Sequence, residues 1–231
     1  MKQIAKDIWT QDGDRIRFHG IPFDTRGVIV RLPDGTLWLH SPVSPTDERV
    51  AEITALGPIA HIIAPNLIHG AYTEQWAALA PDAKVWVSPL FPRKHADIAC
   101  YAVLTDEAPP DWAATIDQCH FAGSKAIDDM VFLHRPSDTL IITDILQRHD
   151  PTREPFLWRM IKGAFGIMAP GGRVPPDIRM SFRDRDAARA ARDRILSWEF
   201  DRILLPHSVP VDTGGKEFFR KAMSWLDQPT P

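Results

Sequence analysis

The first third of the chain alternates short apolar runs with turn residues, the pattern of a β-sheet. Residues 27–32 (GVIVRL) and 36–40 (TLWLH) flank Pro33-Asp34-Gly35. Because Asp-Gly readily adopts the positive φ of a tight turn, these runs predict a β-hairpin. The apolar runs at 60–64 (AHIIA) and 84–88 (KVWVS) predict two more strands.

The rest of the chain mixes further strands with helical stretches. Strands are expected at 115–121, 130–134, 139–143 and 202–205. Helices are expected at about 44–56, 71–80, 90–100, 183–198 and 215–226. Between 151 and 181 a compact apolar stretch leads into Gly-Gly and Pro-Pro, so we expect an excursion from the sheet. Since no linker divides the chain, we expect one α/β domain over 1–231.

Length and composition limit the role that a metal or partner would have. A chain of 231 residues can bury a sizeable core unaided, so a metal would serve chemistry more than folding. The net charge of −3 gives no general attraction to nucleic acid. Two cysteines without a CxxC spacing indicate a reducing compartment. With no signal-like start and no run of ~20 apolar residues, we expect a cytoplasmic protein without a transmembrane segment.

Three of the predicted strands lead to residues that can bind metal. The strand at 60–64 leads to His69, the strand at 139–143 to Asp144, and the strand at 202–205 to His207. In sheets covered by helices, functional groups collect at strand ends, where loops give access and the strands fix position. If the three strands are neighbours, two imidazoles and one carboxylate converge on one point.

Two histidines and one carboxylate form a known ligand set for metals. They suit Zn²⁺ with an open position, and they also suit Fe²⁺ or Mn²⁺. An open position would let the ion polarise a substrate or ionise a bound water. The chain has nine histidines, however, so a histidine at a strand end is also common without any metal. From spacing alone, both a metal site and a set of histidines without a metal are compatible with the sequence.

Longer motifs resemble one known superfamily. Residues 64–69 (APNLIH), 134–144 (HRPSDTLIITD) and Pro206-His207 resemble an uncharacterised, divergent subfamily of the metallo-β-lactamase fold. The order of the predicted elements is similar to that fold over nearly the whole chain. The resemblance implies a four-layer αβ/βα sandwich of the metallo-β-lactamase type, with any site at the edge between two sheets. It also implies a hydrolase-like protein of unknown substrate.

The chain departs from the superfamily at most of the usual ligand positions. The first loop usually reads H-x-H-x-D-H, and those four places hold Pro65, Leu67, His69 and Gly70 here. The middle histidine has no clear counterpart at 123–129, whereas Asp144 and His207 match the bridging aspartate and the last histidine. The resemblance therefore implies at most a mononuclear site on His69, Asp144 and His207. The alternative is a metal-free, non-catalytic binding or assembly module on the same scaffold.

Other residues are weaker candidates. His134 is a further ligand or base, or a structural residue of the turn that follows it. Asp129 either reaches the metal or belongs to a solvated turn. His40 and Ser41 stand near the place of a structural aspartate in the superfamily, as groups behind the ligands or simply as the end of a hairpin. The apolar run between Phe156 and Met168 is a lid, or a contact for a second copy, a ligand or a membrane surface.

Overall fold

The computed structural model describes residues 1–228 and contains two β-sheets with a separate hairpin. The first sheet comprises, in spatial order, β1 (Lys2–Ala5), β2 (Ile8–Asp12), β5 (Arg26–Arg31), β6 (Leu37–His40), β7 (Ile59–Ala64), β8 (Lys84–Val87) and β9 (Ala102–Val103). The pairs from β1 to β6 are antiparallel, and those from β6 to β9 are parallel. Half of the pairings in this sheet are therefore antiparallel, and the other half are parallel and need crossover connections.

The second sheet comes from the C-terminal half. It comprises β10 (Ile116–His120), β11 (Met130–His134), β12 (Thr139–Ile141) and β13 (Arg202–Leu204). The pair β12 and β13 is parallel, so both strands end at the same edge. The small hairpin of β3 (Ile16–Phe18) and β4 (Ile21–Phe23) stands apart from both sheets.

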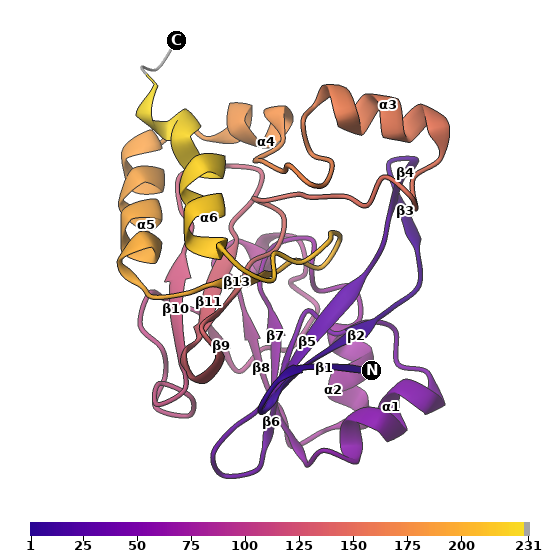
Figure 1. Ribbon diagram of the computed structural model, residues 1–231. Coiled ribbons are helices and arrows are strands. Elements are labelled where there is room, and N and C mark those ends of the chain that lie inside the picture. The colour runs from indigo at the N-terminus through magenta and orange to yellow at the C-terminus, as the bar shows by residue number, and fades with distance from the viewer. Residues whose placement is uncertain (229–231) are drawn as a thin grey trace.

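Helices cover the outer faces of the two sheets. The α-helices are α1 (Asp47–Thr54), α2 (Thr73–Leu79), α3 (Phe156–Ala164), α4 (Pro176–Ser181), α5 (Arg185–Ser197) and α6 (Gly215–Met223). Short 3₁₀ turns are η1 (Phe91–Arg93), η2 (Arg135–Ser137) and η3 (Ser224–Asp227). In Figure 1, α1 and α2 lie by the first sheet, and α5 and α6 lie by the second.

Three hydrophobic cores separate four layers of secondary structure. Alternation along β5 sends Val28 and Val30 into an inter-sheet core with Phe132 of β11, while Ile29 faces the other way. Ile29 packs in a second core with Trp76 of α2. A third core joins the second sheet to α5 and α6. The architecture is therefore the expected four-layer αβ/βα sandwich.

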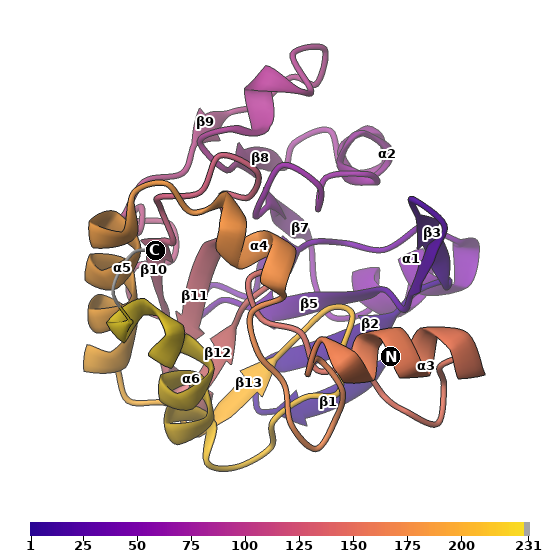
Figure 2. The ribbon, with the colours of Figure 1, turned by 90° about the horizontal axis from the view of Figure 1, so that it is seen from above.

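Most predicted elements are confirmed, but the helix expected at 90–100 is wrong. The structure has only η1 there, followed by turns. Within this stretch Phe91 is the only buried large side chain, so no apolar stripe is available to stabilise an α-helix against the sheet. Residues 151–181 contain α3 and α4, which lie outside both sheets (Figures 1 and 2).

Among residues 1–228, no helix is both long and apolar enough to cross a bilayer.

Candidate metal centre

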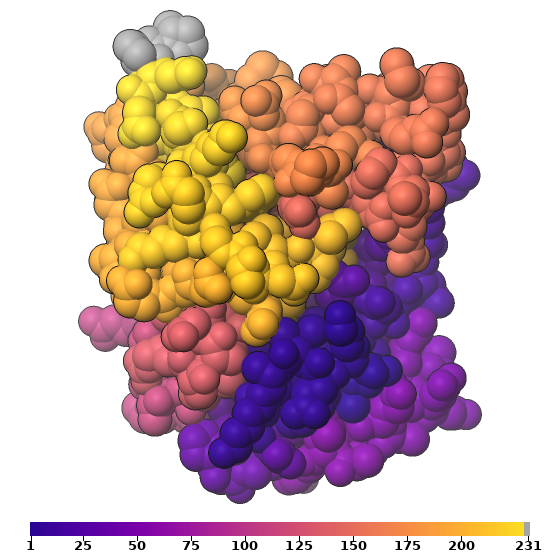
Figure 3. Space-filling view, viewed as in Figure 1, coloured from indigo at the N-terminus to yellow at the C-terminus, as the bar shows by residue number. Residues whose placement is uncertain are grey.

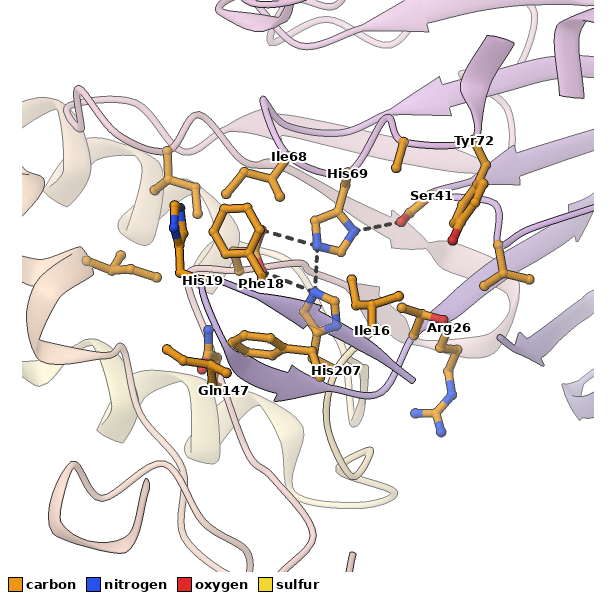
Figure 4. Close-up of a pocket in the computed structure, with 18 of the residues that line it drawn as sticks. Ile16, Phe18, His19, Arg26, Ser41, Ile68, His69, Tyr72, Gln147 and His207 are labelled. Carbon is orange, nitrogen blue, oxygen red and sulfur yellow. Dashed lines mark hydrogen bonds and ion pairs between the residues drawn. The ribbon is translucent and has the colours of Figure 1, made fainter. Parts of the chain in front are cut away.

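Three strands deliver polar side chains to one point at their carboxyl ends. His69 follows β7, Asp144 follows β12, and His207 follows β13. The Nε2 atom of His69 lies 2.9 Å from Nε2 of His207 and 3.2 Å from Oδ2 of Asp144. His207 Nε2 lies 3.5 Å from Asp144 Oδ1. One atom of each residue is thus within 4.8 Å of the other two, close enough for a single ion (Figure 4).

The outer nitrogen of each ring is held by a neighbour. His207 Nδ1 lies 2.5 Å from the carbonyl oxygen of Asp24. Because a carbonyl only accepts hydrogen bonds, Nδ1 carries the proton and the neutral ring presents the lone pair of Nε2 to the cluster. His69 Nδ1 lies 2.7 Å from Oγ of Ser41. Two nitrogens 2.9 Å apart need a proton or a cation between them, and the outer contacts fix both rings in position to share one.

Burial and mutual charge set the titration of the three residues. Burial alone would raise the pKa of Asp144, but the two imidazoles and the Asn66 amide outweigh it and hold that pKa below its usual value. Burial lowers the pKa of His69, yet the Asp144 carboxylate outweighs burial and raises it overall. Burial and the neighbouring His69 lower the pKa of His207 to about 4. In the absence of a metal, the cluster thus keeps an ionised carboxylate and favours a proton on His69 over His207.

Asn66 organises the two loops that carry the ligands. Its side chain is fully buried, and its Nδ2 donates to Oδ2 of Asp144 at 2.9 Å and to a carboxylate oxygen of Asp129. Its Oδ1 accepts from the backbone N–H groups of Ile68 and His69, both at 2.8 Å. One amide therefore fixes the start of the His69 loop and the orientation of the Asp144 carboxylate.

Asp129 lies behind this amide and does not line the pocket. It accepts a hydrogen bond from the Thr143 hydroxyl and another, at 2.8 Å, from the N–H of Ile145. Burial and the Asp144 charge raise the pKa of Asp129 to about 7. The structure thus places Asp129 in a buried polar network rather than a solvated turn, and it is connected to the cluster through Asn66.

His134 is not brought to the cluster. It ends β11, whereas the start of β11 adjoins the site, so about 13 Å of strand separates the two. Its Nδ1 lies 2.7 Å from the hydroxyl of Ser137 in the turn that follows. The structure therefore gives His134 the contact expected of a turn residue.

A pocket of about 320 Å³ opens over the cluster. His69, Asp144, His207 and Ser41 line it together with residues of the β3–β4 hairpin. Figure 4 shows His69, His207 and Ser41 with Phe18 of the hairpin. The apolar members of its lining are Ile16, Phe18, Ile21, Phe23, Pro42, Val43, Ile68, Ala71, Ala126, Ile127 and Ile178. The polar cluster thus sits in a largely hydrocarbon-walled cavity.

Sequence reasoning missed Asn66 and the hairpin. Asn66 lies two residues after the end of the buried strand β7, within the motif at residues 64–69. This position was the signal that could have identified it. The hairpin strands have three residues each, and nothing in their sequence indicates which other segments they approach. Only the folded chain shows that they form a wall of the pocket.

Solved structures with the same fold cover almost all of the chain. A metallo-β-lactamase from Pontibacter korlensis is 12% identical, with a TM-score of 0.65 over 99% of this chain and 98% of that one. TMB-1, solved in a study of substrate and inhibitor binding, is 12% identical, with a TM-score of 0.67 over 98% of this chain and 97% of that one. FIM-1 from Pseudomonas aeruginosa, solved in a mono-zinc form, is 11% identical, with a TM-score of 0.63 over 98% and 93%. Identities this low establish the fold alone.

The family assignment comes from the sequence. No curated protein matches the chain significantly. A family model described as a domain of unknown function, DUF4336, matches residues 6–155, which include β2 to β12 and both His69 and Asp144. The chain therefore belongs to the DUF4336 family and has a metallo-β-lactamase fold.

Proposed function

We propose that the protein is a divergent metal-dependent hydrolase that holds one divalent ion on His69, Asp144 and His207. The observation that carries the proposal is the pair of Nε2 atoms facing each other at 2.9 Å, each on a ring whose other nitrogen is engaged elsewhere. Such outer contacts are typical of histidines that bind metals, because they fix the tautomer and aim the free lone pair.

The distances between the ligand atoms fit an ion. Ligands about 2.1 Å from a tetrahedral centre lie about 3.4 Å from one another. The three observed separations of 2.9, 3.2 and 3.5 Å bracket this value. Two imidazoles and a carboxylate suit Zn²⁺, and also Fe²⁺ or Mn²⁺. The mono-zinc form of the structural neighbour FIM-1 is consistent with a single-ion site on this fold.

The residues around the cluster would support hydrolysis. A bound divalent ion would supply Lewis acidity and would lower the pKa of a water molecule. Asn66 holds the Asp144 carboxylate in a fixed orientation, and Ser41 does the same for His69. The one arginine of the lining, Arg26, is engaged by Asp12 at 2.7 Å and by backbone carbonyls. The largely apolar walls therefore favour an ester-like, amide-like or phosphoester substrate with apolar substituents.

A metal-free binding module is the second candidate. Pro65, Leu67 and Gly70 occupy places where the superfamily usually has ligands, and none of them can bind a metal. A proton on His69 Nε2 would also satisfy the cluster, since Asp144 and His207 both lie within reach of it. In this case the pocket would bind a small molecule without turning it over.

Metal analysis separates the two candidates. The purified protein is supplied in turn with Zn²⁺, Fe²⁺ and Mn²⁺, and the bound metal is measured by mass spectrometry and calorimetry. The proposal expects one ion per chain for at least one metal, and loss of that ion in His69→Ala and Asp144→Asn. The control His134→Ala should retain it, because His134 lies at the far end of β11.

Turnover is tested on the same samples. Hydrolysis of nitrophenyl esters, anilides and phosphodiesters should follow metal content across the variants. Substoichiometric uptake of all three metals would refute the hydrolase proposal. Small-molecule binding that is unchanged in Asp144→Asn would then support the metal-free module.

A further inference from the structure

Helix α3 turns its apolar face to solvent. Phe156, Leu157 and Met160 are 70%, 65% and 59% exposed, although a surface helix normally presents polar residues outward. Gly163 and Ala164 share this outward face and are also exposed. In Figure 3, the orange region of the chain that contains α3 forms part of the visible surface. An exposed apolar face of this kind marks an interaction surface.

The inward face of α3 explains why the helix does not bury its apolar side. Lys162 is 2% exposed, and its ammonium donates to Glu154 at 2.8 Å and to the carbonyl of Pro22 at 2.8 Å. The same ammonium lies 4.9 Å from the ring centroid of Phe23. Rotating the helix to bury its apolar side would break this buried ion pair and leave the Glu154 carboxylate buried without its partner. The outward orientation is therefore fixed by the β3–β4 hairpin.

Apolar side chains are also exposed on the β3–β4 hairpin and on α4, both of which contribute residues to the pocket lining. Phe18 on the hairpin is 38% exposed and lines the pocket, and Met180 on α4 is 73% exposed. In Figures 1 and 2, α3 and α4 lie on the same end of the molecule as the hairpin tip. We define the apolar rim as Phe18, Phe156, Leu157, Met160 and Met180. These residues come from three segments that are far apart in the sequence.

The segments that carry the apolar rim are basic. Residues 15–26 and 151–181 contain eight Arg and Lys against three Asp and Glu, a formal charge of +5. The whole chain is −3, so the remainder carries −8. Within residues 1–228, Arg17, Arg159 and Arg173 are exposed and form no ion pair. Positive charge is therefore concentrated beside the exposed apolar side chains and depleted elsewhere.

The small size of α3, which carries three of the five rim residues, favours a bilayer over a second protein. Nine residues of helix are about 14 Å long and 10 Å wide, so α3 projects only about 140 Å². A stable protein interface needs about 800 Å² on each partner. A lipid surface needs no matching shape, and an anionic one attracts a helix with an apolar face flanked by arginines.

From this combination we infer that the apolar rim docks the protein on the surface of an anionic lipid bilayer. The pocket then opens close to the acyl region, on the side where apolar molecules partition. The inference does not depend on the metal, because the apolar rim and the ligand cluster share no residue.

Vesicle sedimentation tests the inference with the full chain. Vesicles of phosphatidylcholine with a quarter phosphatidylglycerol are compared with vesicles of phosphatidylcholine alone. The triple variant Phe156→Ser/Leu157→Ser/Met160→Ser should bind anionic vesicles about 100-fold more weakly, since partial insertion of three such side chains contributes about 1 kcal/mol each. The matched control Leu79→Ser/Tyr101→Ser/Val103→Ser removes exposed apolar residues elsewhere and should bind like the wild type.

A charge reversal separates electrostatic attraction to anionic lipids from nonspecific hydrophobic adsorption. Arg159→Glu should weaken binding to anionic vesicles about tenfold, should have little effect with neutral ones, and should lose its effect at high salt. Circular dichroism confirms folding of each variant. Absence of binding to anionic vesicles, or binding that the triple variant leaves unchanged, overturns the inference. A dimer in sedimentation velocity that the triple variant dissociates also overturns it, in favour of a contact between two copies.

Discussion

Replacing Asn66 by alanine should damage both stability and the site. The substitution removes the acceptor of two backbone N–H groups, at Ile68 and His69, and the donor to two buried carboxylates. A buried polar group left without a partner costs about 1 to 3 kcal/mol. With part of the loss offset by water entering the small cavity, we expect unfolding to become easier by about 3 to 5 kcal/mol. This is a large fraction of the 5 to 15 kcal/mol that is typical of a folded domain.

Urea denaturation followed by tryptophan fluorescence measures this loss, and calorimetry measures metal affinity on the same variant. On the proposed single-metal site, we expect the affinity to fall about 10- to 100-fold, because Asn66 would then orient a metal ligand. The control Gln118→Ala removes another buried amide, which bonds Trp112 Nε1 and two carbonyls far from the site. It should lose similar stability and keep wild-type affinity. A stability loss below about 1 kcal/mol for Asn66→Ala, or an equal affinity loss in both variants, would refute the reasoning.

Three further substitutions test the electrostatics and the packing. His40 is buried with neither ring nitrogen hydrogen-bonded among the described residues, and burial lowers its pKa from 6.5 to about 3. Its contribution to stability is therefore present above pH 6.5 and is lost as pH falls toward 3, because the unfolded chain binds the extra proton. In His40→Phe, the slope of the unfolding free energy against pH should decrease by about 1.4 kcal/mol per pH unit near pH 5. An unchanged slope would contradict the lowered pKa of His40. A Cβ on Gly70 would meet a buried phenylalanine ring at 2.1 Å, so Gly70→Ala should cost about 1 to 3 kcal/mol in thermal or urea unfolding. Gly163 in α3 has open space around it, so Gly163→Ala should add up to about 1 kcal/mol, and equal effects at the two glycines would argue against this packing.

The sequence determined the elements and the candidate ligands. Alternation of apolar residues and an Asp-Gly turn were sufficient for β5 and β6, because such a hairpin forms between neighbours in the chain. The same local logic identified His69, Asp144 and His207 as polar ends of buried strands. The exception was 90–100, where helical composition lacked an apolar stripe to pack against the sheet.

Tertiary structure decided which residues meet. The contact between His69 and His207 spans 138 positions, and that between Asn66 and Asp129 spans 63. No local pattern encodes such pairs, because they depend on the order of strands across two sheets and on their packing. The outward face of α3 was likewise decided by a buried lysine and by the hairpin that it contacts. Local propensity thus specified what each segment becomes, whereas packing between distant segments specified which polar groups come together.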